Sequence, residues 1–206
     1  MDNDILKSVI DRRSTILSDS QQSQEEFLTI IDIIKRCNSL NGNFAEIGTY
    51  EGFTAEVIYK FMEKNKKLFL CDTFNGILDI SKDDNNTIIT KHSFKVSINK
   101  FKSINPFSKE ENIFIVNGYF PKSATKEMDE SQYAFVHIDT DTYNSTFNSL
   151  EYFYNRMATG GIMLVNDYVN NPWTEGVRKA VNNFLCDKKD LVLTIGSNTQ
   201  GIITKE

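Results

Sequence analysis

One ten-residue stretch, residues 43–52 with the sequence NFAEIGTYEG, constrains what this chain can fold into more than any other. An apolar run ends at Ile47, a short turn lies between Gly48 and Gly52, and an amphipathic segment follows. A strand, a glycine-bearing turn and a helix in this order form the nucleotide site of an open α/β sheet, at the carboxyl end of its first strand. The stretch therefore predicts an α/β fold with a ligand site at this turn.

Glu46 narrows the kind of ligand that the turn suits. A dinucleotide site of the G-x-G-x-x-G type offers backbone N–H groups to a pyrophosphate. Here the pattern is E-x-G-x-x-x-G, with one glycine fewer and a carboxylate beside the turn. A carboxylate repels phosphate and suits a ligand with positive charge, such as S-adenosylmethionine with its ammonium and sulfonium groups. The alternative is an ordinary tight turn in which glycine only provides a positive φ.

Apolar runs and helical periodicity predict a mostly parallel seven-stranded sheet with helices on both faces. Further strands are expected at residues 68–71, 113–116, 133–138, 162–165, 191–195 and 201–204. Helices are expected at 5–17, 24–40, 54–62 and 91–103, then from Thr142 or Ser145 through Met157 to a break at Gly160 and Gly161, and last up to residue 185. The polar segment 73–90 is expected to be a functional lid or a mobile loop.

Length and charge exclude several classes of protein. The 206 residues suit one domain, with a helical extension at 1–42 and an α/β core at 43–206. A net charge of −5 without a basic run argues against a nucleic-acid partner, and no apolar stretch is long enough to span a membrane. The three cysteines lack disulfide or zinc spacing, and no signal-peptide pattern opens the chain, so a cytoplasmic location is expected.

Acidic side chains follow four of the expected strands, at Glu46, Asp72, Asp139 and Asp167. Ligands of open α/β sheets bind at these carboxyl ends, so we expect the four side chains to lie around one site. Asp72 is placed to accept hydrogen bonds from ribose hydroxyls, although a turn or helix-capping aspartate would look the same.

A hard divalent cation is the second ligand that the sequence suggests. Asp139, Asn166 and Asp167 offer only oxygen ligands, which suit Mg²⁺, Ca²⁺ or Mn²⁺. Such an ion would orient a diol and lower the pKa of an attacking hydroxyl. Asp141 could join this set or cap the following helix, and the whole set could also be unrelated turn residues.

Two histidines and two aromatic residues remain as candidates. His137 lies within an apolar strand and is expected to be a core residue, whereas His92 follows the polar segment and is either a general base or an exposed loop residue. Tyr168 and Trp173 would form an aromatic wall beside the site or simply pack.

Five segments resemble the macrocin O-methyltransferase family, and the resemblance runs from about residue 44 to the end of the chain. They are FAEIGTYEGFTA, CDTFNGI, VNGYFPKSA, HIDTDTYNST, and GGIMLVNDY followed by GVRKAVNNF. The most specific is HIDTDTYNST, which is similar to the family's Asp-Gly-Asp-x-Tyr-x-Ser-Thr signature. Two departures are Thr140, in place of that glycine, and Asn166, in place of the first of two aspartates.

The resemblance implies a Rossmann-like class I methyltransferase fold, S-adenosylmethionine as cofactor and Mg²⁺ held by Asp139, Asn166 and Asp167. It implies that His92 and Asp139 are catalytic. It implies that the cofactor contacts are Glu46, Gly48, Thr49, Tyr50, Gly52, Thr54, Asp72, Thr73, Phe74, Gly118, Tyr119 and Asp139.

The favoured hypothesis is a Mg²⁺-dependent O-methyltransferase acting on a hydroxyl of a small-molecule or glycan acceptor, with the N-terminal helices as contacts of a possible homodimer. The substitutions at Thr140 and Asn166 motivate an alternative, a binding or scaffold protein with weakened chemistry. An NAD-linked oxidoreductase is disfavoured by the missing glycine and by Glu46.

Overall fold

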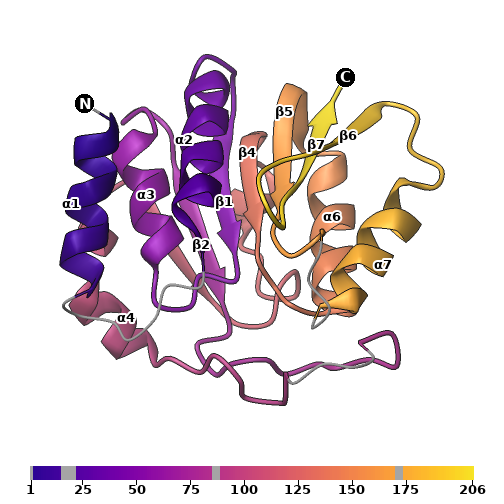
Figure 1. Ribbon diagram of the computed structural model, residues 1–206, viewed down its shortest axis with the longest axis horizontal. Coiled ribbons are helices and arrows are strands. Elements are labelled where there is room, and N and C mark those ends of the chain that lie inside the picture. Colours follow the sequence, from indigo (N-terminus) through magenta and orange to yellow (C-terminus); the bar gives the residue numbers. More distant parts are fainter. Residues whose placement is uncertain (1, 15–21, 85–88, 170–173) are drawn as a thin grey trace.

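The computed structural model describes residues 2–14, 22–84, 89–169 and 174–206 (Figure 1). Its centre is a seven-stranded sheet in the order β3-β2-β1-β4-β5-β7-β6. The strands are β1 (Asn43–Ile47), β2 (Leu68–Asp72), β3 (Ile113–Asn117), β4 (Tyr133–Ile138), β5 (Met157–Val165), β6 (Leu191–Ile195) and β7 (Gly201–Lys205). Neighbours among β1–β5 pair in parallel, and β7 pairs antiparallel with β5 and β6. The predicted, mostly parallel sheet is confirmed.

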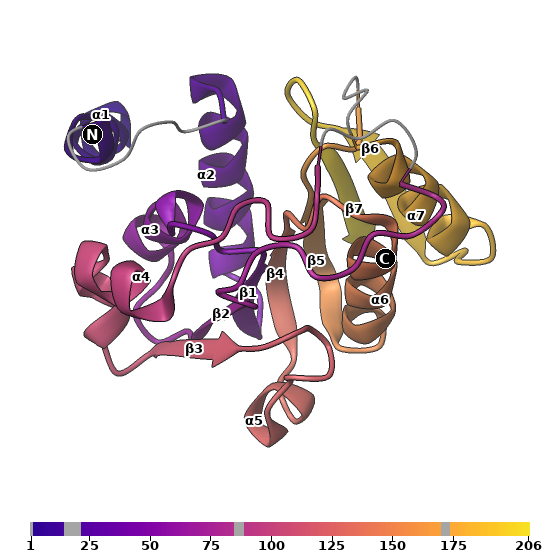
Figure 2. The same ribbon diagram turned by 90° about the horizontal axis from the view of Figure 1, so that it is seen from below.

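Helices cover both faces of this sheet, as Figure 2 shows. They are α1 (Asp2–Ser14), α2 (Gln24–Asn38), α3 (Phe53–Phe61), α4 (Ile98–Ile104), the 3₁₀ helix η1 (Pro106–Lys109), α5 (Lys126–Asp129), α6 (Tyr143–Tyr154) and α7 (Glu175–Leu185). None of the described helices has the length and apolar character needed to cross a membrane.

Successive strand residues supply two apolar cores, one on each face of the sheet. Phe44 and Phe135 pack into the core that includes α2 and α3, whereas Ala45 and Val136 pack into the core that includes α6 and α7. Strands buried on both faces are typical of a parallel sheet under helices. The N-terminal helix α2 belongs to the first core, because Phe27, Ile30 and Ile34 are fully buried on it.

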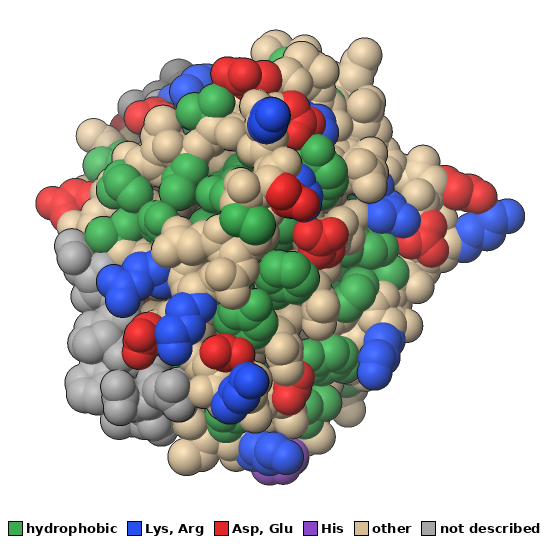
Figure 3. All heavy atoms as spheres, turned by 90° about the vertical axis from the view of Figure 1, so that its right-hand side faces the viewer, with side chains coloured by type: hydrophobic (Ala, Val, Ile, Leu, Met, Phe, Trp, Pro, Cys, Tyr) green, Lys and Arg blue, Asp and Glu red, His purple; other side chains and the backbone are tan. Residues whose placement is uncertain are grey.

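The strand β6 forms one edge of the sheet and carries two exposed apolar side chains, Val192 and Ile195. Figure 3 shows the side of the molecule on which β6 and α7 lie, where apolar and charged side chains are interspersed. Strand β6 itself contains no charged residue, so the charged side chains on this side come from neighbouring segments. The homodimer, predicted through the N-terminal helices, stays a prediction.

The predicted boundary between α6 and β5 was wrong. Met157 begins β5 instead of lying on the helix, and Gly160 and Gly161 lie within the strand. The pairing of β4 with β5 shifts between Tyr133 and Phe135, so β5 contains extra residues at this point, and Gly160 has a φ of +78°. Glycine marks such a bulge in a strand as readily as it ends a helix.

The segment between β2 and α4 is longer than predicted, because α4 begins at Ile98 instead of near residue 91. Asp84 fixes this segment to the N-terminus of α6. Its Oδ1 accepts a hydrogen bond from the backbone N–H of Tyr143 at 2.6 Å, while Thr142, at the capping position, makes no side-chain capping bond. The segment is therefore held against α6, the helix that follows Asp139 and Asp141.

Gly176 leaves the space that Asp84 occupies, because a Cβ on Gly176 would lie 2.0 Å from Asp84 Oδ1. We expect Asp84→Ala and Gly176→Ala each to lower the free energy of unfolding by about 1 kcal/mol, the usual contribution of a helix cap. Asp84→Asn keeps a capping oxygen and is the matched control. Urea denaturation measures the effect, and equal stability of the Ala and Asn variants would contradict the role of Asp84 as a cap.

Candidate functional site

A cavity of about 600 Å³ opens at the carboxyl edge of the sheet, which faces downward for β1 and β2 in Figure 1. The close approach of β1 and β4 shapes its floor. A Cβ on Gly48 would lie 1.8 Å from the backbone oxygen of Asp139, and Gly48 has a φ of +88°, so only glycine fits there. The turn after β1 and the residues after β4 are thereby brought side by side.

Nine of the predicted cofactor contacts line one half of this cavity: Gly48, Thr49, Tyr50, Gly52, Thr54, Asp72, Thr73, Gly118 and Tyr119. Asp72 is held rigidly, because its two carboxylate oxygens accept hydrogen bonds from the N–H groups of Tyr50 at 2.8 Å and Phe74 at 2.7 Å. Burial raises the pKa of the Asp72 carboxyl, and these backbone donors partly counter that shift. A carboxylate fixed in this way can accept hydrogen bonds from vicinal ribose hydroxyls.

Two of the predicted cofactor contacts lie behind the cavity wall. Glu46 is buried, and its Oε1 lies 3.1 Å from Nδ1 of His137. Burial, and then the charge of Asp72, raise the pKa of Glu46 well above its usual value. Phe74 packs its ring against Phe101 and meets the site only through its N–H bond to Asp72. Both side chains are buried beneath the turn and support it from the side away from the cavity.

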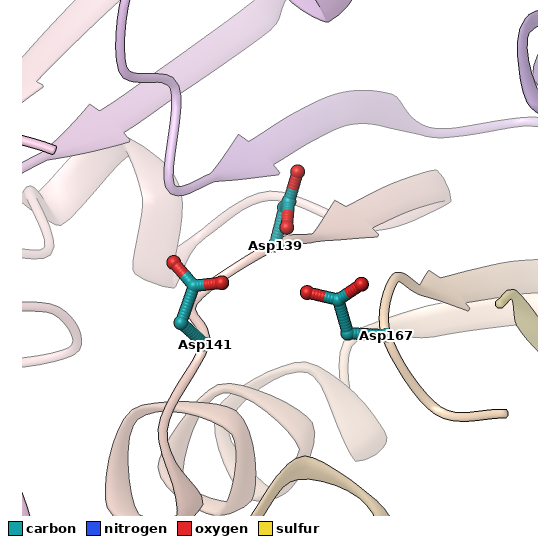
Figure 4. A group of neighbouring side chains, drawn as sticks. All are labelled: Asp139, Asp141 and Asp167. Atoms are coloured by element: carbon teal, nitrogen blue, oxygen red, sulfur yellow. The ribbon is translucent and has the colours of Figure 1, made fainter. Parts of the chain in front are cut away.

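Three aspartates gather in the other half of the cavity. Figure 4 shows the carboxylates of Asp139, Asp141 and Asp167 turned toward one another, and the ligand oxygens of all three lie within 4.8 Å of each other. Of the predicted metal set, Asp139 and Asp167 are thus together, and Asp141 supplies the third carboxylate. Such an oxygen-only cluster has the donor chemistry of a Mg²⁺ or Ca²⁺ site.

Asn166 lies beside this cluster as a hydrogen-bond donor. Its Nδ2 lies 3.4 Å from an oxygen of Asp139 and 3.4 Å from an oxygen of Asp167. Its Oδ1 is buried and has no hydrogen-bond partner among the described residues. A turned amide would present that oxygen to a bound cation, so the residues present fit a hard divalent ion.

The surroundings of the acidic cluster disfavour the ionised forms of Asp139 and Asp141. Burial, and then the charge of Asp167, raise the pKa of Asp141 to about 7. Burial also raises the pKa of Asp139 well above its usual value, and the neighbouring Asp141 and Asp167 add to that shift. A divalent cation would relieve this repulsion and favour the ionised carboxylates.

This cluster predicts that the metal-free protein loses stability as the pH rises. The folded protein keeps a proton on Asp141 up to a pH of about 7, whereas the unfolded chain releases it near pH 4. Stability is therefore expected to fall between pH 4 and 7 without metal, and added Mg²⁺ should raise the unfolding temperature more at pH 8 than at pH 5. Thermal melts in chelator and in Mg²⁺ test this, and Asp141→Asn should flatten the slope.

The predicted base His92 does not reach the cavity. Its Nδ1 lies 3.0 Å from the backbone oxygen of Asn75, its side chain is exposed, and it does not line the cavity in the described structure. Its backbone has a φ of 68°. Tyr168 also lies apart and hydrogen-bonds Asn182 at 3.0 Å. Trp173, the second residue of the predicted aromatic wall, falls outside the described residues.

Two segments remote in sequence complete the acidic half, and the sequence motifs did not indicate either. Gln22 donates to Asp139 Oδ2 at 3.2 Å and accepts a hydrogen bond from Thr54 at 2.9 Å. The turn between β6 and β7 contributes Asn198, which donates to Ser23 Oγ at 2.8 Å. The one available signal was the concentration of polar residues just before α2.

Two curated relatives share modest sequence identity with this chain. The demethyldecarbamoylnovobiocin O-methyltransferase of Streptomyces niveus is 21% identical over 66% of this chain, and the match spans only 56% of that relative's length. The mycinamicin III 3''-O-methyltransferase of Micromonospora griseorubida is 20% identical over 75% of this chain and 72% of its own length.

A solved structure and a family model extend these comparisons. The structure of the O-methyltransferase NovP superposes with a TM-score of 0.72 at 18% identity, covering 100% of this chain and 99% of the other, and so confirms the class I methyltransferase fold. The model of the macrocin-O-methyltransferase (TylF) family matches residues 21–193. That match covers most of the chain, and this protein therefore belongs to the macrocin-O-methyltransferase family.

Proposed function

We propose that this protein transfers the methyl group of S-adenosylmethionine to a hydroxyl of a sugar or of a sugar-bearing natural product, with the help of a divalent cation. The observation that supports this most is the joining of two half-sites in one cavity. The Gly48 turn with Asp72 forms a pocket suited to an adenosyl donor, and the three aspartates lie next to it. The names of the two curated relatives agree with this chemistry.

Each part of the reaction has a residue of the cavity that can perform it. Asp72 holds the ribose, and the glycine turn leaves space for the methionine part of the donor. A cation bound by Asp139 and Asp167 would orient the acceptor hydroxyl and lower its pKa. The hydroxyl oxygen then attacks the methyl carbon in line as the bond from that carbon to sulfur breaks, so alignment of the two reactants is the main contribution of the protein.

Asp141 is the residue we assign to proton removal. It lines the cavity, and a cation held by Asp139 and Asp167 would keep its carboxylate ionised and able to accept the hydroxyl proton. No histidine lines the cavity in the described parts of the chain, so the predicted role of His92 passes to a carboxylate.

Calorimetry with S-adenosylhomocysteine and a methyl-transfer assay with labelled S-adenosylmethionine test the proposal together. Saturable binding of S-adenosylhomocysteine, and label transfer to glycosides that chelators abolish, are the expected results. Absence of binding to the folded protein would refute the proposal. Binding without any effect of Mg²⁺ and without label transfer would favour the alternative of a scaffold protein.

A further inference from the structure

Gln22 lies where the two halves of the cavity meet, and its side-chain amide bonds to both of them. Its Nε2 donates to Oδ2 of Asp139 at 3.2 Å, and its Oε1 accepts from the hydroxyl of Thr54 at 2.9 Å. Asp139 belongs to the aspartate cluster, whereas Thr54 lies in the first turn of α3, directly after the glycine turn. All three residues line the cavity. One side chain thus joins the acidic half to the cofactor half.

The chemistry of the two partners determines which way this amide points. When a cation is bound, the Asp139 carboxylate is ionised and can only accept hydrogen bonds, so the amide nitrogen must face it. The amide oxygen then faces Thr54, whose hydroxyl can donate. A single orientation of the amide satisfies both partners, and the Thr54 hydroxyl holds the end that is remote from Asp139.

The backbone next to Gln22 is held in place by the start of α2. Ser23 is the N-cap of that helix, and it forms a reciprocal capping box with Glu26. Asn198, from the turn between β6 and β7, donates to Ser23 Oγ at 2.8 Å. Because its backbone is anchored at this cap, the Gln22 side chain reaches Asp139 and Thr54 from a fixed position.

Gln22 and Asn166 hold different oxygens of the Asp139 carboxylate. The bond from Gln22 to Oδ2 is 3.2 Å long, within the usual range, whereas Nδ2 of Asn166 lies 3.4 Å from Oδ1. Figure 4 shows one oxygen of Asp139 directed toward the other two aspartates and one directed away, so rotation of the carboxylate changes what the cluster presents to a cation. Loss of a group that hydrogen-bonds a metal ligand commonly weakens metal binding by about 10- to 100-fold.

We propose that Gln22 is a positioning residue, which orients Asp139 for the cation and, through Thr54, couples cation binding to binding of the methyl donor. The proposal rests on the proposed function and deepens it. A glutamine side chain loses rotamer freedom when it is fixed. A donor bound against the first turn of α3 holds Thr54 and thereby Gln22, so the cation then meets an Asp139 that is already oriented. Such coupling is reciprocal, and the cation strengthens donor binding by the same factor.

A second connection between the two halves runs through the backbone. The N–H of Asp139 donates to the oxygen of Ile47 at 2.9 Å, and Gly48 approaches the backbone oxygen of Asp139 so closely that no Cβ fits between them. Coupling through this contact does not need the Thr54 hydroxyl. A substitution at Thr54 therefore distinguishes the two connections.

Mn²⁺ is the probe for the cation site, because oxygen ligands of this kind suit it and its free concentration can be read by electron paramagnetic resonance. Its Kd is measured with and without saturating S-adenosylhomocysteine. In the unmodified protein we expect S-adenosylhomocysteine to lower this Kd by about tenfold. In Gln22→Ala we expect a Kd about tenfold higher in the presence of S-adenosylhomocysteine, and no effect of S-adenosylhomocysteine upon it. An unchanged Kd in folded Gln22→Ala would overturn the inference.

Substitutions at Thr54 separate positioning from a merely structural role. Thr54→Val keeps the shape without the hydroxyl and should reduce the effect of S-adenosylhomocysteine on Mn²⁺ binding to less than about twofold, whereas Thr54→Ser should retain it. Thr29→Val makes the same change on α2, where Thr29 bonds Ser197 at 2.8 Å and is not among the described residues that line the cavity. This control should behave like the unmodified protein. Full coupling in Thr54→Val would assign the connection to the backbone and overturn the role of Gln22 in it.

The same titrations separate failure of this inference from failure of the proposed function. A folded protein that does not bind S-adenosylhomocysteine or Mn²⁺ would refute the proposed function, and the inference with it. Binding of both ligands without any effect of one on the other would overturn the inference alone.

Discussion

Replacement of Asp139 by asparagine is expected to lower kcat for methyl transfer by about 100-fold or more, the range expected when metal or acid–base assistance is lost. Asp139 connects the parts of the acidic half of the cavity. It accepts hydrogen bonds from Gln22 at 3.2 Å and Asn166 at 3.4 Å, and it belongs to the three-aspartate cluster. Asparagine keeps the shape and removes the charge, so the protein should fold. The measurement is single-turnover methyl transfer over a Mg²⁺ titration.

Two further variants make the result specific. Asp187→Asn removes an exposed carboxylate that pairs with Lys188 and should leave kcat unchanged. Asn166→Asp adds a fourth carboxylate beside the cluster and should tighten Mg²⁺ binding, which isothermal calorimetry measures directly. If Asp139→Asn keeps kcat within about threefold of the original and binds Mg²⁺ equally well, the assignment of metal and proton chemistry to this cluster is wrong.

The sheet and the position of the site could be predicted because both depend on local patterns. Continuous apolar runs mark buried parallel strands, and an acid after each run marks the edge where they end. The structure confirms this for Asp72, Asp139 and Asp167, all of which line one cavity. Glu46 pairs with Leu70 and His137, two residues before Asp72 and Asp139, so it lies deeper in the sheet and is buried beside His137 instead of lining the cavity.

The remaining parts of the site could not be predicted because they depend on contacts between distant segments. Asn198 reaches the cavity only because the β6–β7 turn docks on the start of α2, and the sequence contains no periodic signal for such docking. The same holds for Asp84, which caps a helix 59 positions away. His92 was favoured for its chemistry, yet its ring bonds to the backbone oxygen of Asn75 and its exposed side chain does not line the cavity.

A second large effect is expected at Arg13, which joins α1 to the cofactor turn. Its side chain is 2% exposed and donates to Glu56 Oε2 at 2.8 Å and to the backbone oxygens of Glu51 at 3.0 Å and Gly52 at 2.7 Å. It also donates to the buried side chain of Asn105, which in turn donates to the oxygen of Glu51 at 3.0 Å. Helices α1 and α4 thus hold the outer side of a turn whose inner side lines the cavity.

Arg13→Met should therefore weaken both the fold and the cofactor site. It leaves Glu56 buried with only Arg12 beside it and leaves two carbonyl oxygens without this donor. We expect a loss of about 3 kcal/mol in the free energy of unfolding, the lower end for breaking a buried ion pair. We also expect a roughly tenfold weaker Kd for S-adenosylhomocysteine, equivalent to about 1.4 kcal/mol, because the turn is no longer held.

Arg12→Met is the matched control for this prediction, since Arg12 contacts the same Glu56 carboxylate from a side chain that is 34% exposed. It should cost less than about 1 kcal/mol, as partly exposed ion pairs do, and should leave the Kd unchanged. Arg13→Lys retains the charge but cannot reach the several acceptors at once, so it should recover part of the stability and little of the affinity. Urea denaturation and calorimetry separate the two effects. Equal stability of the Arg13→Met and Arg12→Met proteins, or an unchanged Kd in folded Arg13→Met, would show that α1 is not coupled to the cofactor turn.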